Sequence, residues 1–265
     1  MNSVCFTPRF NPNFTALRRA QYDCKNANGD IKPITIYEME PRDIEYLGKF
    51  MDKLEMSDEC KNSKDYDSRM EVTSGGVLDM YRTCIEKKEG NPAFDKTRMF
   101  MAFDGNKSCG FIMGNIPKKN EKVDNNIHYS ARKESTPTET ELDWFATWNE
   151  KGGEKLRGVG SALSTEFLIS TEKDNFDNIF VQSEVESKGS PAFGVYGNFG
   201  FKELGKMTTE RELFFYKPLL EDSNELDSKV IPMLLSKENK QKRISITENR
   251  RTELDGASVN LDSLA

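Results

Sequence analysis

Lys155-Leu156-Arg157-Gly158-Val159-Gly160 is the stretch that decides the fold of this chain. It follows a strand-like segment at 141–148, and a helical pattern of apolar residues begins inside it and continues to about residue 173. The first turn of a helix has unpaired N–H groups and about half a positive charge, and glycines let an anion approach the backbone closely. Lys155 and Arg157 add positive charge. The stretch therefore predicts an anion site that suits a pyrophosphate.

The segments around this turn predict an α+β fold. In chain order they are a strand at 34–39, helices at 41–54 and 77–85, and a hairpin of 99–103 with 109–114 across Asp104-Gly105-Asn106-Lys107; the strand at 141–148 and the helix from Gly158 follow, then a strand at 178–185, a helix at 190–199, and strand-like segments at Phe201 and 211–216. This order predicts a mixed sheet in which one helical crossover, after Gly158, joins two parallel strands.

Polar segments at both ends and one inside divide the chain. Residues 1–30 are rich in Asn and Pro without periodicity and predict an N-terminal extension. One domain spans 31–219, with a solvated insertion at about 118–138 that contains His128, the only histidine. Residues 220–265 are polar apart from 230–235, which predicts a mobile tail. Within this tail, the run 240–245 is either a docking or phosphorylation site or a solvated charge run.

Composition narrows the class of function. The five cysteines are odd in number and form no CxxC pair, so neither a disulfide framework nor a metal site is indicated, and Cys109 is expected to pack in a strand. The sequence shows no leader-like start and no long apolar run, which predicts a soluble cytoplasmic protein without a membrane partner. The net charge of −6 argues against a nucleic-acid partner and favours a cationic one.

Two motifs in order resemble those of one family. Lys155-x-x-Gly158-x-Gly160 is similar to the [RQ]-x-x-G-x-[GA] signature of the GCN5-related N-acetyltransferases (GNAT), with lysine in place of the first Arg or Gln. The stretch 192–201 resembles the A-x-x-x-Y-x-x-x-G-F pattern of the same family, and the order of strands and helices from 34 to 219 is similar too. A third glycine is missing and no G-x-x-x-x-G-K-[ST] is present, which disfavours Rossmann and Walker nucleotide sites.

The resemblance implies a GNAT-type sheet, mostly antiparallel and flanked by helices, with a splayed parallel strand pair at the cofactor site. It implies acetyl-CoA as co-substrate, with the pyrophosphate on the turn and the pantetheine arm along the first splayed strand, where its amides complete an open ladder. The residues expected to bind it are Phe145, Ala146, Thr147, Trp148, Lys155, Leu156, Arg157, Gly158, Val159, Gly160, Ser161 and Tyr196.

The same resemblance implies catalytic roles. Tyr196 stands where a tyrosine hydroxyl protonates the departing thiolate, although a core aromatic is the alternative. An acceptor amine must lose a proton, and Glu184 and Asp143 are ranked ahead of Glu141 and Glu186 as carboxylates for that step, each with a merely solvated side chain as the alternative.

The leading hypothesis is an acetyl-CoA-dependent N-acetyltransferase in which an acceptor amine, from a small molecule or a protein, attacks the thioester directly. A monomer or a homodimer is expected. An inactive acyl-CoA-binding or partner-recruiting module is the second hypothesis, and a nucleotide-binding domain that shares only the glycine turn is the third. Acidic residues after the first predicted helix favour a basic acceptor without choosing one: Asp52, Glu55, Asp58 and Glu59.

Overall fold

The structure is a computed structural model that describes residues 15–39, 97–115, 139–147, 155–173, 176–184, 191–203, 208–209 and 229–260. Its strands are β1 (Thr15–Lys25), β2 (Ile31–Met39), β3 (Thr97–Asp104), β4 (Lys107–Asn115), β5 (Glu139–Thr147), β6 (Asn178–Glu184), β7 (Lys202–Glu203), β8 (Thr208–Thr209), β9 (Lys229–Leu235), β10 (Arg251–Glu253) and β11 (Ser258–Asn260). Its helices are α5 (Val159–Lys173), α6 (Pro191–Phe199) and α8 (Lys237–Glu248).

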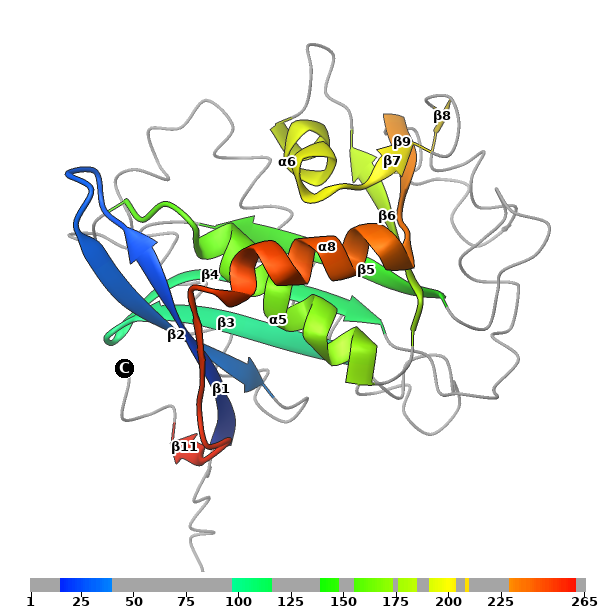
Figure 1. Cartoon of the computed structure of the whole chain (residues 1–265). Coiled ribbons are helices and arrows are strands. Elements are labelled where there is room, and N and C mark those ends of the chain that lie inside the picture. Colours follow the sequence, from blue (N-terminus) through cyan, green and yellow to red (C-terminus); the bar gives the residue numbers. More distant parts are fainter. Residues whose placement is uncertain are drawn as a thin grey trace, which may run out of the picture.

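The strands form one 11-stranded sheet in the order β10-β1-β2-β3-β4-β5-β6-β9-β7, with β11 added to β1 and β8 to β9 (Figure 1). Within the described ranges, only β5 and β6 pair in parallel, and every other pair is antiparallel. The predicted fold class, an α+β fold with a mostly antiparallel sheet and one parallel pair, is confirmed.

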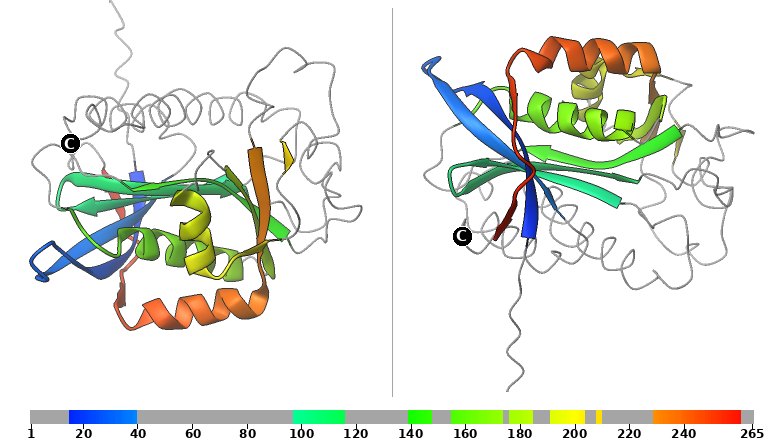
Figure 2. Two further views of the ribbon diagram at one scale, coloured as in Figure 1. Left: turned by 90° about the horizontal axis from the view of Figure 1, so that it is seen from above. Right: turned by 60° about the horizontal axis from the view of Figure 1, so that its bottom comes forward.

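Helix α5 lies on one face of the sheet, and α8 packs over α5 on the side away from the strands (Figure 2). Because α5 is covered on both sides, even its hydroxyl side chains are largely buried. They are satisfied inside the helix: Ser164 Oγ donates to the Gly160 carbonyl at 2.8 Å and Ser170 Oγ to the Phe167 carbonyl at 2.7 Å. Burial of these polar groups therefore leaves no hydroxyl without a partner.

The core lies between the sheet and α5. Its largest fully buried side chains are Tyr22, Phe100, Phe167, Ile34 and Ile36. They come from the first three strands and from α5, so burial of aromatic and β-branched side chains holds the helix against the sheet. The helix is thereby fixed in position, and its N-terminus with it.

Residues 15–25, placed in the N-terminal extension by the sequence, instead form β1 near one edge of the sheet. Its buried positions include Ala16 and Ala20, and a register shift between Arg18 and Ala20 interrupts the alternation along the strand. Small buried residues and a bulge give only a weak strand pattern. Tyr22 and Cys24 are fully buried all the same, so this segment belongs to the domain.

The predicted mobile tail is also different in the structure. Residues 229–260 form β9, α8, β10 and β11, and β9 lies inside the sheet between β6 and β7. Ser236 caps α8, since its hydroxyl accepts from the Asn239 N–H at 3.4 Å. Lys240 is 1% exposed; its ammonium donates to the Phe176 carbonyl and pairs with Glu172 at 2.9 Å. The polar helix is anchored by these bonds rather than by an apolar stripe.

The hairpin β3–β4 is confirmed, with Asp104 paired to Lys107 across Gly105 and Asn106. Strand β5, helix α5, strand β6 and helix α6 also lie where the sequence predicts them, within two residues at each end. The predicted helices at 41–54 and 77–85, the insertion at 118–138 and the segment 211–216 lie outside the described residues.

Candidate functional site

The parallel strands β5 and β6 separate soon after they meet. They pair through only three residue pairs, from Glu139 with Asn178 to Glu141 with Phe180. Beyond this point β5 continues to Thr147 beside β4 alone, and β6 continues to Glu184 beside β9 alone. Both strands run in the same direction, so they form a fork that opens toward their carboxyl ends. Ligands of α/β sheets bind at such ends.

A β-bulge stands where the fork begins. Leu142 pairs with Gly114 and Trp144 with Met113, which leaves Asp143 as the extra residue of β5. A bulge bends its strand and increases the local twist, so it turns β5 away from β6 directly after the last parallel pair. The backbone places Asp143 on one branch of the fork and Glu184 at the end of the other. Their side chains lie outside what the structure describes, as do those of Glu141 and Ala146.

The glycine turn follows the end of β5 and opens α5. Gly158 has φ +104°, which disfavours any other residue. A Cβ on Gly158 would stand 2.8 Å from Arg250 Nη1, and a Cβ on Gly160 would stand 2.9 Å from Phe145 Cζ. The first N–H to bond back into the helix is that of Ala162, to the Gly158 carbonyl at 3.0 Å. The N–H groups before it are those that a helix start offers to an anion.

Strand β1 holds the glycine turn in place through contacts of its last two residues, Cys24 and Lys25. Lys25 and Arg157 exchange two backbone hydrogen bonds, with the Arg157 N–H donating at 2.7 Å and the Lys25 N–H at 3.1 Å. Cys24 packs under Gly158, 3.4 Å from the position of a Cβ there. Burial raises the pKa of the Cys24 thiol to about 11, so it is protonated at neutral pH and a poor nucleophile. Lys155 and the Arg157 side chain are exposed beside the turn.

Helix α6 lies beyond the other branch of the fork. Tyr196 is 7% exposed, and its ring stands 5.5 Å from the ring of Phe201 in an edge arrangement. Phe199 makes a similar contact, with its ring 5.7 Å from that of Phe145 on β5. The aromatic side chains therefore connect α6 to the first branch of the fork, next to Gly160.

Helix α8 spans the gap between α5 and α6. Arg243 Nη2 donates to Ser161 Oγ at 2.6 Å, and the Arg243 guanidinium lies over the Phe199 ring, 4.6 Å from its centroid. Directly after α6, the Gly200 carbonyl accepts from Asn239 Nδ2 at 3.0 Å. Burial, and to a smaller extent the charge of Arg250, lowers the pKa of Arg243.

The sequence did not predict Arg243 and Arg250 as site residues, because they lie in the segment that was expected to be a mobile tail. The available signal was the apolar run 230–235 followed by the cap residue Ser236.

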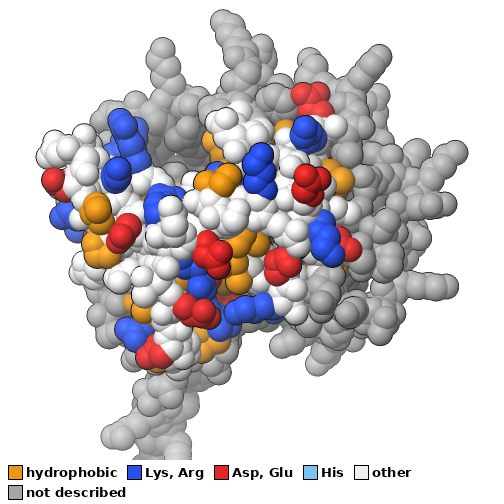
Figure 3. Space-filling model, in the orientation of Figure 1, with side chains coloured by type: hydrophobic (Ala, Val, Ile, Leu, Met, Phe, Trp, Pro, Cys, Tyr) orange, Lys and Arg blue, Asp and Glu red, His pale blue; other side chains and the backbone are white. Residues whose placement is uncertain are grey.

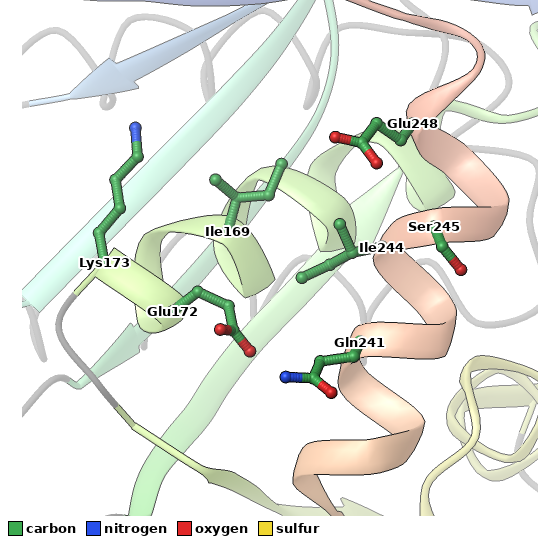
Figure 4. A pocket seen from close by; sticks show the side chains of 7 residues that line it. All are labelled: Ile169, Glu172, Lys173, Gln241, Ile244, Ser245 and Glu248. Atoms are coloured by element: carbon green, nitrogen blue, oxygen red, sulfur yellow. The ribbon is translucent and has the colours of Figure 1, made fainter.

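A separate groove of about 310 Å³ runs between α5 and α8 (Figure 4). Ile169 and Ile244 line it together with charged and polar side chains at the rim. In the view of Figure 3, acidic and basic side chains alternate over this face with small hydrophobic areas between them. The residues of α5 that line the groove, Ile169, Glu172 and Lys173, belong to the C-terminal part of the helix, so the groove is away from the glycine turn and the fork is the better candidate site.

Of three comparisons with known proteins, only the one with solved structures found similar chains. The chain is similar to solved structures of GNAT acetyltransferases, including RimJ of Mycobacterium smegmatis in complex with CoA-disulfide (12% identity, 88% of this chain, 95% of that chain, TM-score 0.46). Others are mutant forms of the spermidine/spermine N-acetyltransferase SpeG of Vibrio cholerae (17%, 79% and 98%, 0.42) and Ard1 of Thermoplasma volcanium (19%, 77% and 97%, 0.40). No family model and no curated protein matches. At these scores neither activity nor acceptor is carried over from the structures.

The structure brings the glycine turn and the end of β5 together, since Gly160 lies beside Phe145 and Thr147. Tyr196 lies on α6, whose Phe199 contacts Phe145. Trp148 and Glu186 lie outside the described residues, as does His128. Cys109 is buried in β4 as expected. Among the residues described, no helix is long and apolar enough to span a membrane, and no group of three or more metal-ligating side chains occurs.

Proposed function

We propose that the chain is an acetyl-CoA-dependent N-acetyltransferase whose acceptor is an amine of a small molecule or a protein. One observation carries this proposal: the parallel strands part after three residue pairs, and the glycine turn stands at the open end of the fork. An open ladder next to an anion-binding helix start suits a ligand that joins amide groups to a pyrophosphate, which is the chemistry of coenzyme A.

The described residues fit such a ligand. Gly158 and Gly160 add no side chain of their own at the start of α5, and the exposed Lys155 and Arg157 add positive charge beside it. The pantetheine arm would run along the backbone of Phe145 to Trp148. Side-chain identity matters little for a backbone ladder, so the mixed residue types there are acceptable. The thioester, when bound, supplies an acyl carbon that an amine can attack.

The proposal assigns a role to several of the chain's own groups. In the transfer, the amine nitrogen bonds to the acyl carbon, the carbon–sulfur bond breaks, and the sulfur takes a proton. Tyr196 on α6 is proposed to donate that proton through its hydroxyl. Glu184 and Asp143, on the two branches of the fork, are proposed to accept the proton that the amine loses, directly or through water. Cys24 is a poor nucleophile, which favours direct attack over an acyl-enzyme.

The test is a free-CoA release assay with acetyl-CoA across small amines, amino acids, aminoglycosides and lysine peptides, with a reaction lacking amine as the blank. Isothermal titration with acetyl-CoA is run in parallel. The proposal expects binding and at least one acceptor that releases CoA above the blank. Absence of any CoA binding would refute it.

A binding module without turnover is the second candidate. The position of α8 favours it, because Arg243 connects Ser161 and Phe199 across the gap between α5 and α6. Such a module would bind CoA in titration, but it would form no free CoA from acetyl-CoA with any acceptor. Turnover that is lost in Tyr196→Phe would exclude it.

A further inference from the structure

Three arginines around the start of α5 differ from the other arginines of the described residues. Arg18 pairs with Asp255, Arg19 and Arg98 with Glu38, and Arg251 with Glu166. Among the described residues, no carboxylate forms an ion pair with Arg157, Arg243 or Arg250. The three unpaired guanidinium groups thus belong to the glycine turn itself or contact Ser161 and Gly158 within it.

Positive charge accumulates at this point without compensation from the described residues. Arg250 Nη1 lies against the Cα of Gly158, and its hydrogen bond to the Asp23 carbonyl is long, at 3.5 Å. Arg243 Nε is buried and has no acceptor among the groups described. The start of α5 adds its own partial positive charge. Like charges at close range and a buried donor without an acceptor are both unfavourable, and an anion between them relieves both.

We propose that Arg243 of α8 and Arg250 of the turn after it bind the pyrophosphate of coenzyme A together with the N–H groups of the glycine turn. This inference rests on the proposed function and extends it to the C-terminal part of the chain. Arginine suits the role because its planar donors match phosphate oxygens in pairs. Arg243 also stacks on Phe199 and reaches Ser161, so it closes the site from the side opposite the sheet.

The arrangement gives a second reason for glycine at position 158. The backbone must adopt φ +104°, and the Arg250 guanidinium must also approach the Cα closely. A phosphate bound to the turn amides then lies within reach of the same guanidinium. The glycine thereby serves the backbone, the arginine and the anion at one position.

The experiment is isothermal titration of CoA and of dephospho-CoA, which keeps the pyrophosphate and lacks the 3′-phosphate. The proteins are the wild type, Arg243→Gln, Arg250→Gln and, as the matched control, Lys242→Gln, which removes an exposed charge from the same helix. Affinity for both ligands is expected to fall about tenfold or more in Arg243→Gln and in Arg250→Gln. In Lys242→Gln it is expected to stay within about twofold, because exposed charges are screened.

Each outcome is decisive. Equal affinities in the two arginine variants and in Lys242→Gln overturn the inference and leave the proposed function intact. A loss confined to CoA assigns the arginines to the 3′-phosphate and overturns the pyrophosphate assignment. A wild type that binds no CoA refutes the proposed function, and the inference with it. Thermal melting checks that each variant folds; if Arg243→Gln does not, Arg243→Lys, which keeps the charge and loses the paired donors, decides with Arg250→Gln.

Discussion

Glu166 of α5 and Arg251 of β10 form an ion pair of 2.6 Å between Oε1 and Nε, with side chains only 4% and 10% exposed. The Tyr22 hydroxyl on β1 donates to the same carboxylate at 2.6 Å. Burial and the adjacent carboxylate raise the pKa of Tyr22 well above its usual range, so its proton stays in this bond. Three segments far apart in the chain thus meet at one carboxylate beneath α5.

The first prediction concerns this ion pair. Glu166→Ala leaves the buried Arg251 with only the exposed Glu253, 3.5 Å away, as a partner, and we expect a loss of about 3–5 kcal/mol in the free energy of unfolding, measured by urea denaturation. Arg18→Ala serves as the control, because its partner Asp255 is exposed and the loss should be about 1 kcal/mol or less. Equal losses in the two variants would show that Glu166 and Arg251 contribute no more than a surface pair.

The second prediction concerns Gly158. Gly158→Ala must hold a non-glycine residue at φ +104° and displace Arg250, and we expect about 1–3 kcal/mol lower stability together with weaker CoA binding. Gly29→Ala is the matched control: Gly29 has φ +91° and open space around it, so only the backbone strain applies. Thermal melting and CoA titration of both variants separate the two effects. Unchanged CoA affinity in Gly158→Ala would contradict the assignment of the turn.

The third prediction concerns alkaline pH. Burial raises the pKa of Cys24 from its usual value of 9.0 to about 11, so the folded protein holds this proton more tightly than the unfolded chain does. The stabilisation is complete below pH 9 and decreases between pH 9 and 11, because the unfolded chain ionises first. At pH 10 we expect about 1 kcal/mol less stability than at pH 8 from this group. Cys24→Ala should lose less between these two pH values in urea denaturation; an equal loss would count against Cys24.

The fourth prediction concerns Tyr196. Tyr196→Phe removes the proposed acid and keeps the ring that packs on Phe201, so we expect kcat to fall about 100-fold or more with CoA affinity unchanged. Tyr37→Phe is the control, since Tyr37 is a buried tyrosine of β2 whose ring packs on Phe103. A kcat in Tyr196→Phe equal to that of the control would assign Tyr196 to the core alone.

Local patterns allowed part of the fold to be predicted. The turn Asp104-Gly105-Asn106-Lys107 and the helix after Gly158 each depend on a few neighbouring residues, and both lie where expected. Strand β1 was missed because its buried positions are partly alanine and its alternation is broken at the bulge before Ala20. Helix α8 was missed because charged residues, Lys240 above all, hold it in place through partners far away in the sequence.

The candidate site, like the fold, has one part that depends on neighbouring residues and one part that depends on residues far apart in the sequence. Its turn is a continuous stretch, so residues 155–161 could be predicted as site residues from sequence and motif. Arg243 and Arg250 come from the C-terminal part of the chain, and Arg243 lies 82 positions after its partner Ser161. No local sequence pattern connects the two arginines to the turn. Which carboxylate accepts the amine proton stays a prediction, because the side chains of Asp143 and Glu184 lie outside the described residues.

Strand pairing between the two ends of the chain has a kinetic consequence. Thr15 pairs with Asn260 and Tyr22 with Arg251, while β9 enters the sheet beside β6. Contacts between residues so distant in sequence slow folding, because the entropy of closing the long loop is lost before the contact forms. Synthesis from the N-terminus delivers β1 early and its partners β10 and β11 last. The nascent sheet therefore has an open edge until β10 and β11 are synthesised. The arginines of the proposed anion site, Arg243 and Arg250, are synthesised directly before these two strands.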